Sequence, residues 1–164
     1  MSLITNNEKK EEKKTENVTF IPKQEIVKKD KYYIATYALL YYMLVDKRCL
    51  KYYDEGKINF PNEEERFLAS EISYYYQKYG IITPADFYTY LSNRQNLLAT
   101  LDKVMELDLD EQVEEKVILD YINTLRLFQT NREIKRLEKI LKEENDIMIQ
   151  ASIAQKIAKL KQEI

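Results

Sequence analysis

The scarcity of turn-forming residues constrains this chain more than any other feature. Its 164 residues include only two glycines and three prolines, whereas average usage would be about 7% glycine and 5% proline. A β-sandwich or β-barrel needs a turn roughly every ten residues. Because 33% of the residues are charged and apolar residues recur at intervals of three and four, we expect an all-α fold.

Several short motifs predict where helices begin. Asn62 followed by Glu65 has the spacing of a capping box, and Thr83 followed by Pro84 is typical of a helix start. Asp110 precedes the longest apolar pattern in the chain, so we expect it to cap the longest helix. The pattern predicts a helical bundle of five to six helices over residues 31–128.

The last helix of the bundle is expected to extend into an antiparallel C-terminal hairpin over residues 129–164. The sequence "EEND" separates two apolar patterns, with Asn145 suited to a left-handed C-cap and Asp146 to the following N-cap. Helices joined by so short a connection lie antiparallel. The sequence leaves open whether the long helix bends at "QTNRE", residues 129–133.

Residues 1–30 are rich in charge and poor in apolar side chains, without a sustained period. This composition predicts a disordered charged linker. The sequence leaves open whether residues 1–3 are native.

The composition argues against catalysis and metal binding in this chain. It contains no histidine and one cysteine, Cys49, which removes the commonest general base and metal ligand. No phosphate-binding loop or nucleophile motif is present. The longest apolar run, residues 32–45, falls short of the roughly twenty residues of a membrane span and predicts a buried helix. We expect a non-enzymatic, cytoplasmic protein without catalytic residues, metal or cofactor.

Tyrosine is unusually abundant, and thirteen of the fourteen tyrosines lie between Tyr32 and Tyr90. They could form a base-stacking platform, centred on Tyr74 to Tyr76, or pack in a core. Residues 32–128 carry 10 basic and 16 acidic side chains, and such an excess of acid repels phosphate. We therefore expect core tyrosines and no direct contact with nucleic acid.

The predicted hairpin has two faces. Its pairing face is expected to comprise Ile134, Leu137, Leu141, Ile149, Ile153, Ile157 and Leu160. The remaining face of the last helix is small, apolar or weakly polar, and is available to a partner. The candidate partner-binding residues are Ile147, Met148, Ala151, Ser152, Ala154, Gln155, Ala158 and Lys159. A coiled-coil dimerisation module is the alternative reading of this hairpin.

A second, smaller candidate site is a group of basic residues after the first helix. Lys47, Arg48 and Lys51 lie close together in the sequence, and such a group could receive an acidic peptide. The alternative is a solvated helix end.

Three segments together resemble the C-terminal helicase-binding domain of bacterial DNA primase, over roughly residues 32–164. They are "YYIATYALLYYMLVDKRCL", "NEEERFLASEISYYYQKYGIITPADFYTYL" and "LDYINTLRLFQTNREIKRLEKIL". Each motif alone is weakly specific, and the resemblance rests on the order and spacing of the three segments together. The chain departs from the family in its many tyrosines and in having Asn145 where a glycine is usual.

The resemblance implies a docking role in DNA replication. The hairpin would bind the N-terminal domain of the hexameric replicative DNA helicase, coupling RNA primer synthesis to fork unwinding. Lys47, Arg48 and Lys51 would contact the acidic tail of single-stranded DNA-binding protein. The alternative is the similarly folded N-terminal domain of the helicase itself; the charged linker before the bundle and the chain end after the hairpin favour primase.

Overall fold

The structure is a computed structural model that describes residues 29–164. This part of the chain contains seven helices and no strand, which confirms the all-α prediction. The predicted linker, apart from Lys29 and Asp30, lies outside the described residues. The helices are α1 (Lys31–Val45), α2 (Lys47–Asp54), α3 (Glu63–Tyr79), α4 (Pro84–Tyr90), α5 (Gln95–Met105), α6 (Glu115–Glu143) and α7 (Ile147–Gln162).

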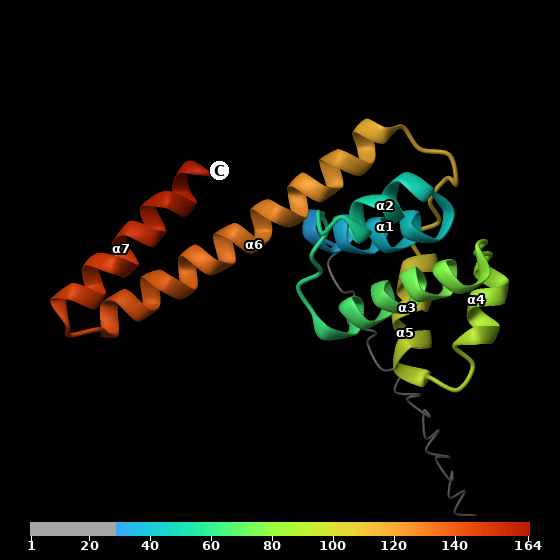
Figure 1. Ribbon diagram of the computed structural model, residues 1–164, viewed down its shortest axis with the longest axis horizontal. Helices are drawn as coiled ribbons and strands as arrows, with labels where there is room; N and C mark the ends of the chain where they lie inside the picture. Colours follow the sequence, from blue (N-terminus) through green and yellow to red (C-terminus); the bar gives the residue numbers. More distant parts are fainter. Residues whose placement is uncertain (1–28) are drawn as a thin grey trace, which may run out of the picture.

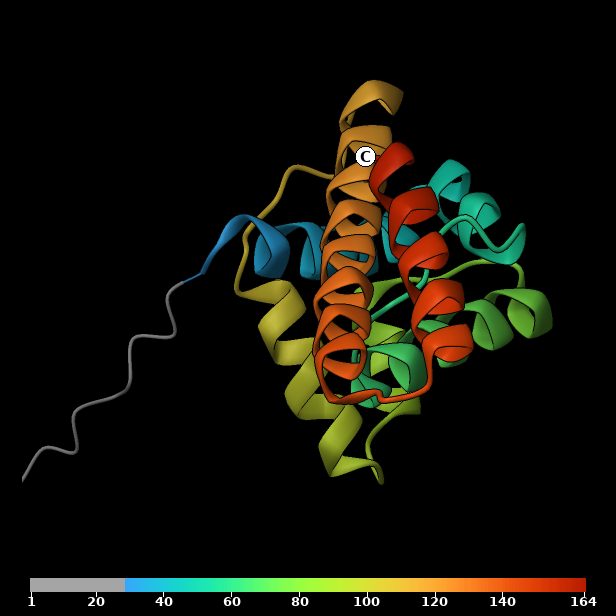
Figure 2. The same ribbon diagram turned by 90° about the vertical axis from the view of Figure 1, so that its left-hand side faces the viewer.

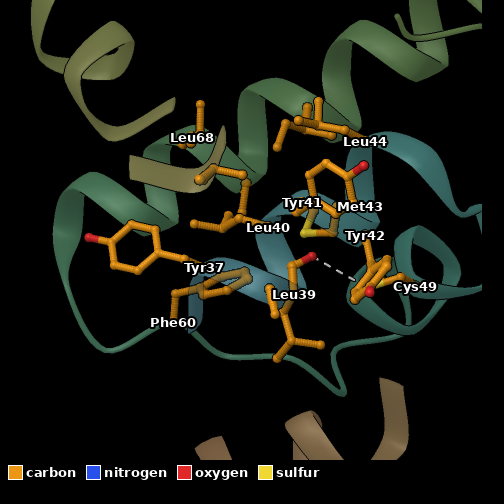
Figure 3. Close-up of a cluster of buried hydrophobic side chains, with 14 of the residues drawn as sticks. Tyr37, Leu39, Leu40, Tyr41, Tyr42, Met43, Leu44, Cys49, Phe60 and Leu68 are labelled. Carbon is orange, nitrogen blue, oxygen red and sulfur yellow. Dashed lines mark hydrogen bonds between the residues drawn. The ribbon is translucent and has the colours of Figure 1, made fainter. Parts of the chain in front are cut away.

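Helix α1 lies at the centre of the larger part of the molecule (Figure 1). Residues 35–44 are all buried, and α1 packs against α2, α3, α5 and α6. A helix that is apolar all round is stable in water only when neighbours cover every face. Figure 3 shows the α1 side chains among Leu68, Phe60 and Cys49 from the surrounding segments. The buried helix predicted for this run is confirmed.

Two of the predicted helix starts are confirmed. The side chain of Glu65 accepts a hydrogen bond from the backbone N–H of Asn62, with 3.3 Å between the atoms. Thr83 caps α4 by accepting a hydrogen bond from the backbone N–H of Asp86 at 3.2 Å, and Pro84 is the first residue of that helix. Each cap satisfies an N–H that has no partner within its helix.

The predicted start of the longest helix at Asp110 is wrong. Helix α6 begins at Glu115, after Glu114 as N-cap. The chain turns at Asp108, whose φ is 48°, and then runs without helical structure while Leu109 and Val113 pack against the larger core. A helix that began at Asp110 could not follow this extended path. The packing of Leu109 and Val113 therefore outweighs the local cap signal at Asp110.

The described chain has two separate apolar clusters. The larger one includes residues of α1 to α6. The smaller one joins the second half of α6 to α7 and is centred on Ile134, Leu137 and Ile157. Helix α6 is one uninterrupted helix of 29 residues that contributes to both, and its second half extends away from α1 to α5 (Figure 1).

The connection from α6 to α7 is short, and its conformation differs from the prediction at Asn145. The C-cap of α6 is Glu144, in an extended conformation with φ −80° and ψ 134°; Asn145 does not adopt a positive φ. Asp146 caps α7 as predicted, because its carboxylate accepts hydrogen bonds from the N–H groups of Met148, at 2.8 Å, and Ile149, at 3.3 Å. Helix α7 then runs beside the second half of α6 (Figure 2).

Candidate partner-binding surface

The inner face of α7 is occupied by its contact with α6. Three apolar side chains from each helix form the smaller cluster: Ile134, Leu137, Leu141, Ile153, Ile157 and Leu160. All six were predicted for the pairing face. These side chains fix the rotation of α7 about its axis, and therefore fix which of its residues face away from α6.

Ion pairs between the two helices reinforce this orientation. Lys161 lies 3.0 Å from Glu138 and Lys156 lies 3.6 Å from Glu133. Glu133 also pairs with Arg136, at 2.7 Å. Hydrogen bonds from Arg136, aided by the charge of Lys156, hold the pKa of Glu133 below its ordinary value. These exposed ion pairs each add little to stability, but they agree with the register that the apolar contacts set, and they leave the outward face of α7 uncovered.

All eight predicted partner-binding residues of α7 are exposed, and the structure brings them together on the outward face of this helix. They fall on the side of the helical wheel opposite the side chains that contact α6. We call these residues the α7 face: Ile147, Met148, Ala151, Ser152, Ala154, Gln155, Ala158 and Lys159.

The first turn of α7 exposes large apolar side chains. Ile147 is 79% exposed, Met148 80% and Ile149 47%. Ile149 was predicted on the pairing face, but it lies outside the α6–α7 cluster. It lies near the connection, where fewer α6 side chains remain to cover it. Several exposed apolar side chains in one place are typical of an interaction surface.

The remainder of the α7 face includes a row of small side chains. Ala151, Ala154 and Ala158 follow one another at spacings of three and four and are all exposed. Their short side chains allow a second helix to approach closely, because the distance between packed helices depends on the side chains at the contact. Together with the exposed apolar first turn, this row favours contact with a helical partner.

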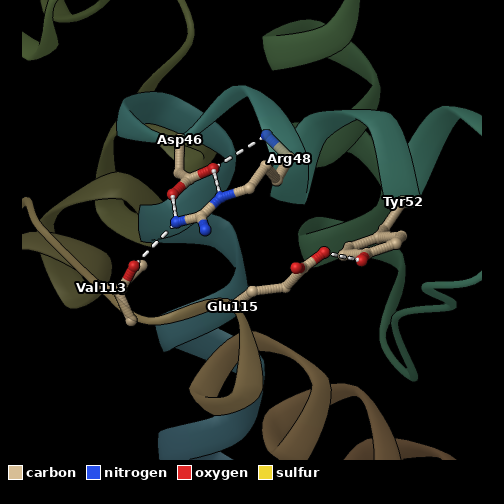
Figure 4. A network of polar contacts seen from close by, with 5 residues as sticks. All are labelled: Asp46, Arg48, Tyr52, Val113 and Glu115. Carbon is tan, nitrogen blue, oxygen red and sulfur yellow. Dashed lines mark hydrogen bonds and ion pairs between the residues drawn. The ribbon is translucent and has the colours of Figure 1, made fainter.

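The three basic residues of the second candidate site each lie close to a group of the same chain. Arg48 is held by Asp46, with 2.7 Å between Nη2 and Oδ2, and donates a second hydrogen bond to the carbonyl oxygen of Val113, also at 2.7 Å (Figure 4). Lys51 lies 3.9 Å from Glu55. The Lys47 ammonium lies 6.0 Å from the ring centroid of a tyrosine, Tyr76.

Arg48 instead connects α2 to the segment that leads into α6. Its hydrogen bonds lower the pKa of Asp46, against the opposing effect of burial. A few residues further on, the hydroxyl of Tyr52 donates a hydrogen bond to Glu115 in the first turn of α6 (Figure 4). These contacts stabilise the fold, and they use the Nε and Nη2 groups of Arg48, which an acidic peptide could otherwise bind.

Most tyrosines of the described chain are part of the packing. Tyr37, Tyr41 and Tyr42 are buried in α1. The hydroxyl of Tyr88 donates to Asp102 at 2.8 Å, and that of Tyr90 donates to Glu71 at 2.7 Å. These bonds connect α4 to α5 and α3, so the rings fill the interior while the hydroxyls reach polar partners near the surface.

The Tyr74 to Tyr76 group is not a stacking platform. Tyr74 is 53% exposed, but Tyr75 and Tyr76 are partly buried and pack against the larger cluster. The ring of Tyr75 meets Phe87 edge-on, with 5.7 Å between centroids, and meets Tyr90 in the same way at 5.0 Å. A ring held between such neighbours has no free face for a base.

Between residues 29 and 164, no three His, Cys, Asp or Glu side chains lie close enough together to hold a metal ion. No helix of the same range is long and apolar enough to cross a membrane. Cys49 is buried, and burial raises the pKa of its thiol.

No protein-family model, curated protein or solved structure matches this chain.

Proposed function

We propose that this chain is a non-catalytic interaction domain that binds a helical protein partner through the α7 face. Following the resemblance to the C-terminal domain of bacterial DNA primase, the partner is the N-terminal domain of the hexameric replicative DNA helicase. This contact would couple RNA primer synthesis to unwinding at the replication fork.

One observation carries the proposal: the exposed apolar first turn of α7. Ile147 and Met148 are about four-fifths exposed. Burying these apolar side chains against a partner would remove them from water, which is favourable. The rest of α7 is held by α6 contacts that leave these two side chains free. A partner that covers them gains apolar burial at no cost to the fold.

The finer arrangement of the fold is part of the same proposal. We infer a bundle over residues 31–128 and a hairpin over 129–164, in which the hairpin presents the binding helix. The separation of the two apolar clusters supports this division. The contacts of Arg48 with Asp46 and Val113 leave less of its guanidinium available to the acidic tail of single-stranded DNA-binding protein, which stays a possible second partner of this chain.

A truncation tests the division and the binding together. A chain that ends at residue 144 should lose binding to the isolated N-terminal domain of the helicase in a pull-down, while circular dichroism shows that residues 31–128 keep their helical structure. Retained binding by the truncated chain contradicts the proposal.

Two alternatives make different predictions. A coiled-coil dimerisation module would sediment as a dimer through the α7 face, whereas the proposal predicts a monomer in the absence of the helicase. The N-terminal domain of a helicase would be followed in its gene by an ATP-binding loop, which a primase C-terminal domain would lack.

A further inference from the structure

A second surface lies on α6, on the side away from α7. Four basic residues follow one another there at spacings of three, four and three: Arg132, Lys135, Lys139 and Lys142. All four are exposed. At 3.6 residues per turn these spacings place them in one row, and a rise of 1.5 Å per residue makes that row about 15 Å long. We call it the basic row.

The basic row makes no ion pairs within the described chain. Between residues 29 and 164 none of the four side chains has an ion-pair partner. The nearby acids Glu133 and Glu138 are paired with side chains outside the row, including Lys156 and Lys161 of α7. Glu143 lies near the end of the row, so four cations and one carboxylate leave the row clearly positive.

An aromatic pair lies at the beginning of the basic row. The rings of Tyr32, from α1, and Phe128, from α6, are tilted by 40° with 4.6 Å between their centroids. Both rings line an open hollow of about 300 Å³ together with Asn131, Arg132 and Lys135. Figure 2 shows the start of α1 on the opposite side of α6 from α7. The hollow is therefore separate from the α7 face.

We propose that the aromatic pair and the basic row bind single-stranded nucleic acid. One base stacks in the hollow against Tyr32 and Phe128, and the phosphates that follow it lie along the row. Proteins that bind single strands combine aromatic rings with a positively charged track in this way. The tilted rings of Tyr32 and Phe128 add an apolar stacking surface to the positively charged row. This combination suits a base followed by phosphates better than a peptide that supplies carboxylates alone.

The basic row lies outside the acidic segment of the chain. No direct contact with nucleic acid was expected, because residues 32–128 carry an excess of acid. The basic row begins at Arg132, beyond that segment, and the fold brings Tyr32 from the other end of the segment to meet it. The surface combines residues about 100 positions apart, which no local pattern reveals.

Fluorescence anisotropy with a labelled thymidine oligonucleotide tests the proposal on the full chain. We expect binding at low salt, with a log–log salt slope of about −3, because each of about four phosphates contributes roughly −0.7. Lys135→Glu with Lys139→Glu should weaken binding at least tenfold. The matched control is Lys103→Glu with Lys116→Glu, two exposed lysines outside the row, and its affinity should change less than twofold.

Two competitors distinguish the kind of ligand. An abasic strand of the same length, which offers phosphates without bases, should bind at least fivefold more weakly than the thymidine strand. Polyglutamate should displace the strand poorly. Equal binding of the abasic strand, effective displacement by polyglutamate, equal losses in both double variants, or no binding at low salt would each overturn the proposal.

Discussion

Gln129 of α6 donates a hydrogen bond from its side-chain amide to the backbone carbonyl oxygen of Asn59, with 2.6 Å between the atoms. This bond lies where α6 leaves the larger cluster. The sequence "QTNRE" interrupts the apolar pattern at the same place, yet α6 is continuous from Glu115 to Glu143. The apolar pattern is therefore interrupted because the neighbours of α6 change at this point. Polar contacts replace apolar ones, and the helix itself continues.

Removing this bond should weaken the attachment of α6. We expect Gln129→Ala to lower the free energy of unfolding by about 1 kcal/mol, since a net hydrogen bond contributes roughly that much. Urea denaturation followed by circular dichroism measures it. Asn123→Ala is the control, because Asn123 is an exposed residue of the same helix. Equal effects of the two changes would show that the bond contributes nothing.

Truncating the smaller cluster should loosen α7 without unfolding the larger part. Leu137 is 5% exposed, and Leu→Ala in a core costs about 2 to 5 kcal/mol. We expect a cost near the lower limit for Leu137→Ala, because few neighbours surround it. Hydrogen exchange should accelerate in α7 while the α1 amides keep their protection.

The comparison variant is Leu68→Ala, in the larger cluster, where Leu68 is fully buried. It should accelerate exchange in α1 as well. If Leu137→Ala accelerated exchange equally in both regions, the two clusters would unfold as one unit.

Acid should weaken the contact between α2 and the segment before α6. Hydrogen bonds from Arg48 hold the pKa of Asp46 below its ordinary value of 3.8. A carboxyl with a lower pKa in the folded chain stabilises the fold above its unfolded pKa, and the contribution is lost as the pH falls through its folded pKa. The Asp46→Asn variant should therefore lose less stability than the original chain when the pH falls below about 4.

Thermal unfolding followed across this pH range measures the effect. Asp110→Asn, at an exposed position, is the control and should retain the pH dependence of the original chain. An unchanged pH dependence in Asp46→Asn would contradict the assignment.

Alkali should destabilise the fold through tyrosines whose hydroxyls are held by partners in the packing. Burial and the hydrogen bond to Asp102 raise the pKa of Tyr88 from 10.0 to about 12. The folded chain holds the proton more tightly than the unfolded chain, so stability is intact below about pH 10 and falls as the pH rises towards 12. Tyr88→Phe should reduce this fall, as measured by denaturation at several pH values.

Tyr74→Phe is the matched control, since Tyr74 is 53% exposed. It should leave the alkaline loss of stability unchanged. Identical behaviour of the two variants would show that the Tyr88 hydroxyl is not responsible.

Local signals predicted much of the fold because they act through neighbouring residues. The cap at Thr83 depends on contacts within a few positions, and the run of α1 can be read because its apolar residues are consecutive in the sequence. Both were predicted correctly. Asp110 failed as a cap because Leu109 and Val113 hold that segment against the core. Asn145 failed because the chain passes from α6 to α7 without a left-handed residue.

The surfaces were predictable to different degrees. The α7 face follows from helical periodicity once the pairing face is known, and all eight of its residues are exposed. The engagement of Arg48 by Val113, 65 positions away, could not be predicted from a local basic cluster. The hollow lined by Tyr32 and Phe128 could not be predicted from a local pattern either, because it forms only where α1 packs against α6.

We propose that the α7 face binds the N-terminal domain of the replicative helicase. Isothermal titration calorimetry of the full chain and its Met148→Glu variant with that domain tests this proposal. Met148 is 80% exposed, so the change should not disturb folding. Gln112→Glu, at an exposed position before α6, is the control of equal charge. We predict at least tenfold weaker binding for Met148→Glu, or about 1.4 kcal/mol, and no change for Gln112→Glu. Equal affinity of both variants and the original chain would contradict the claim.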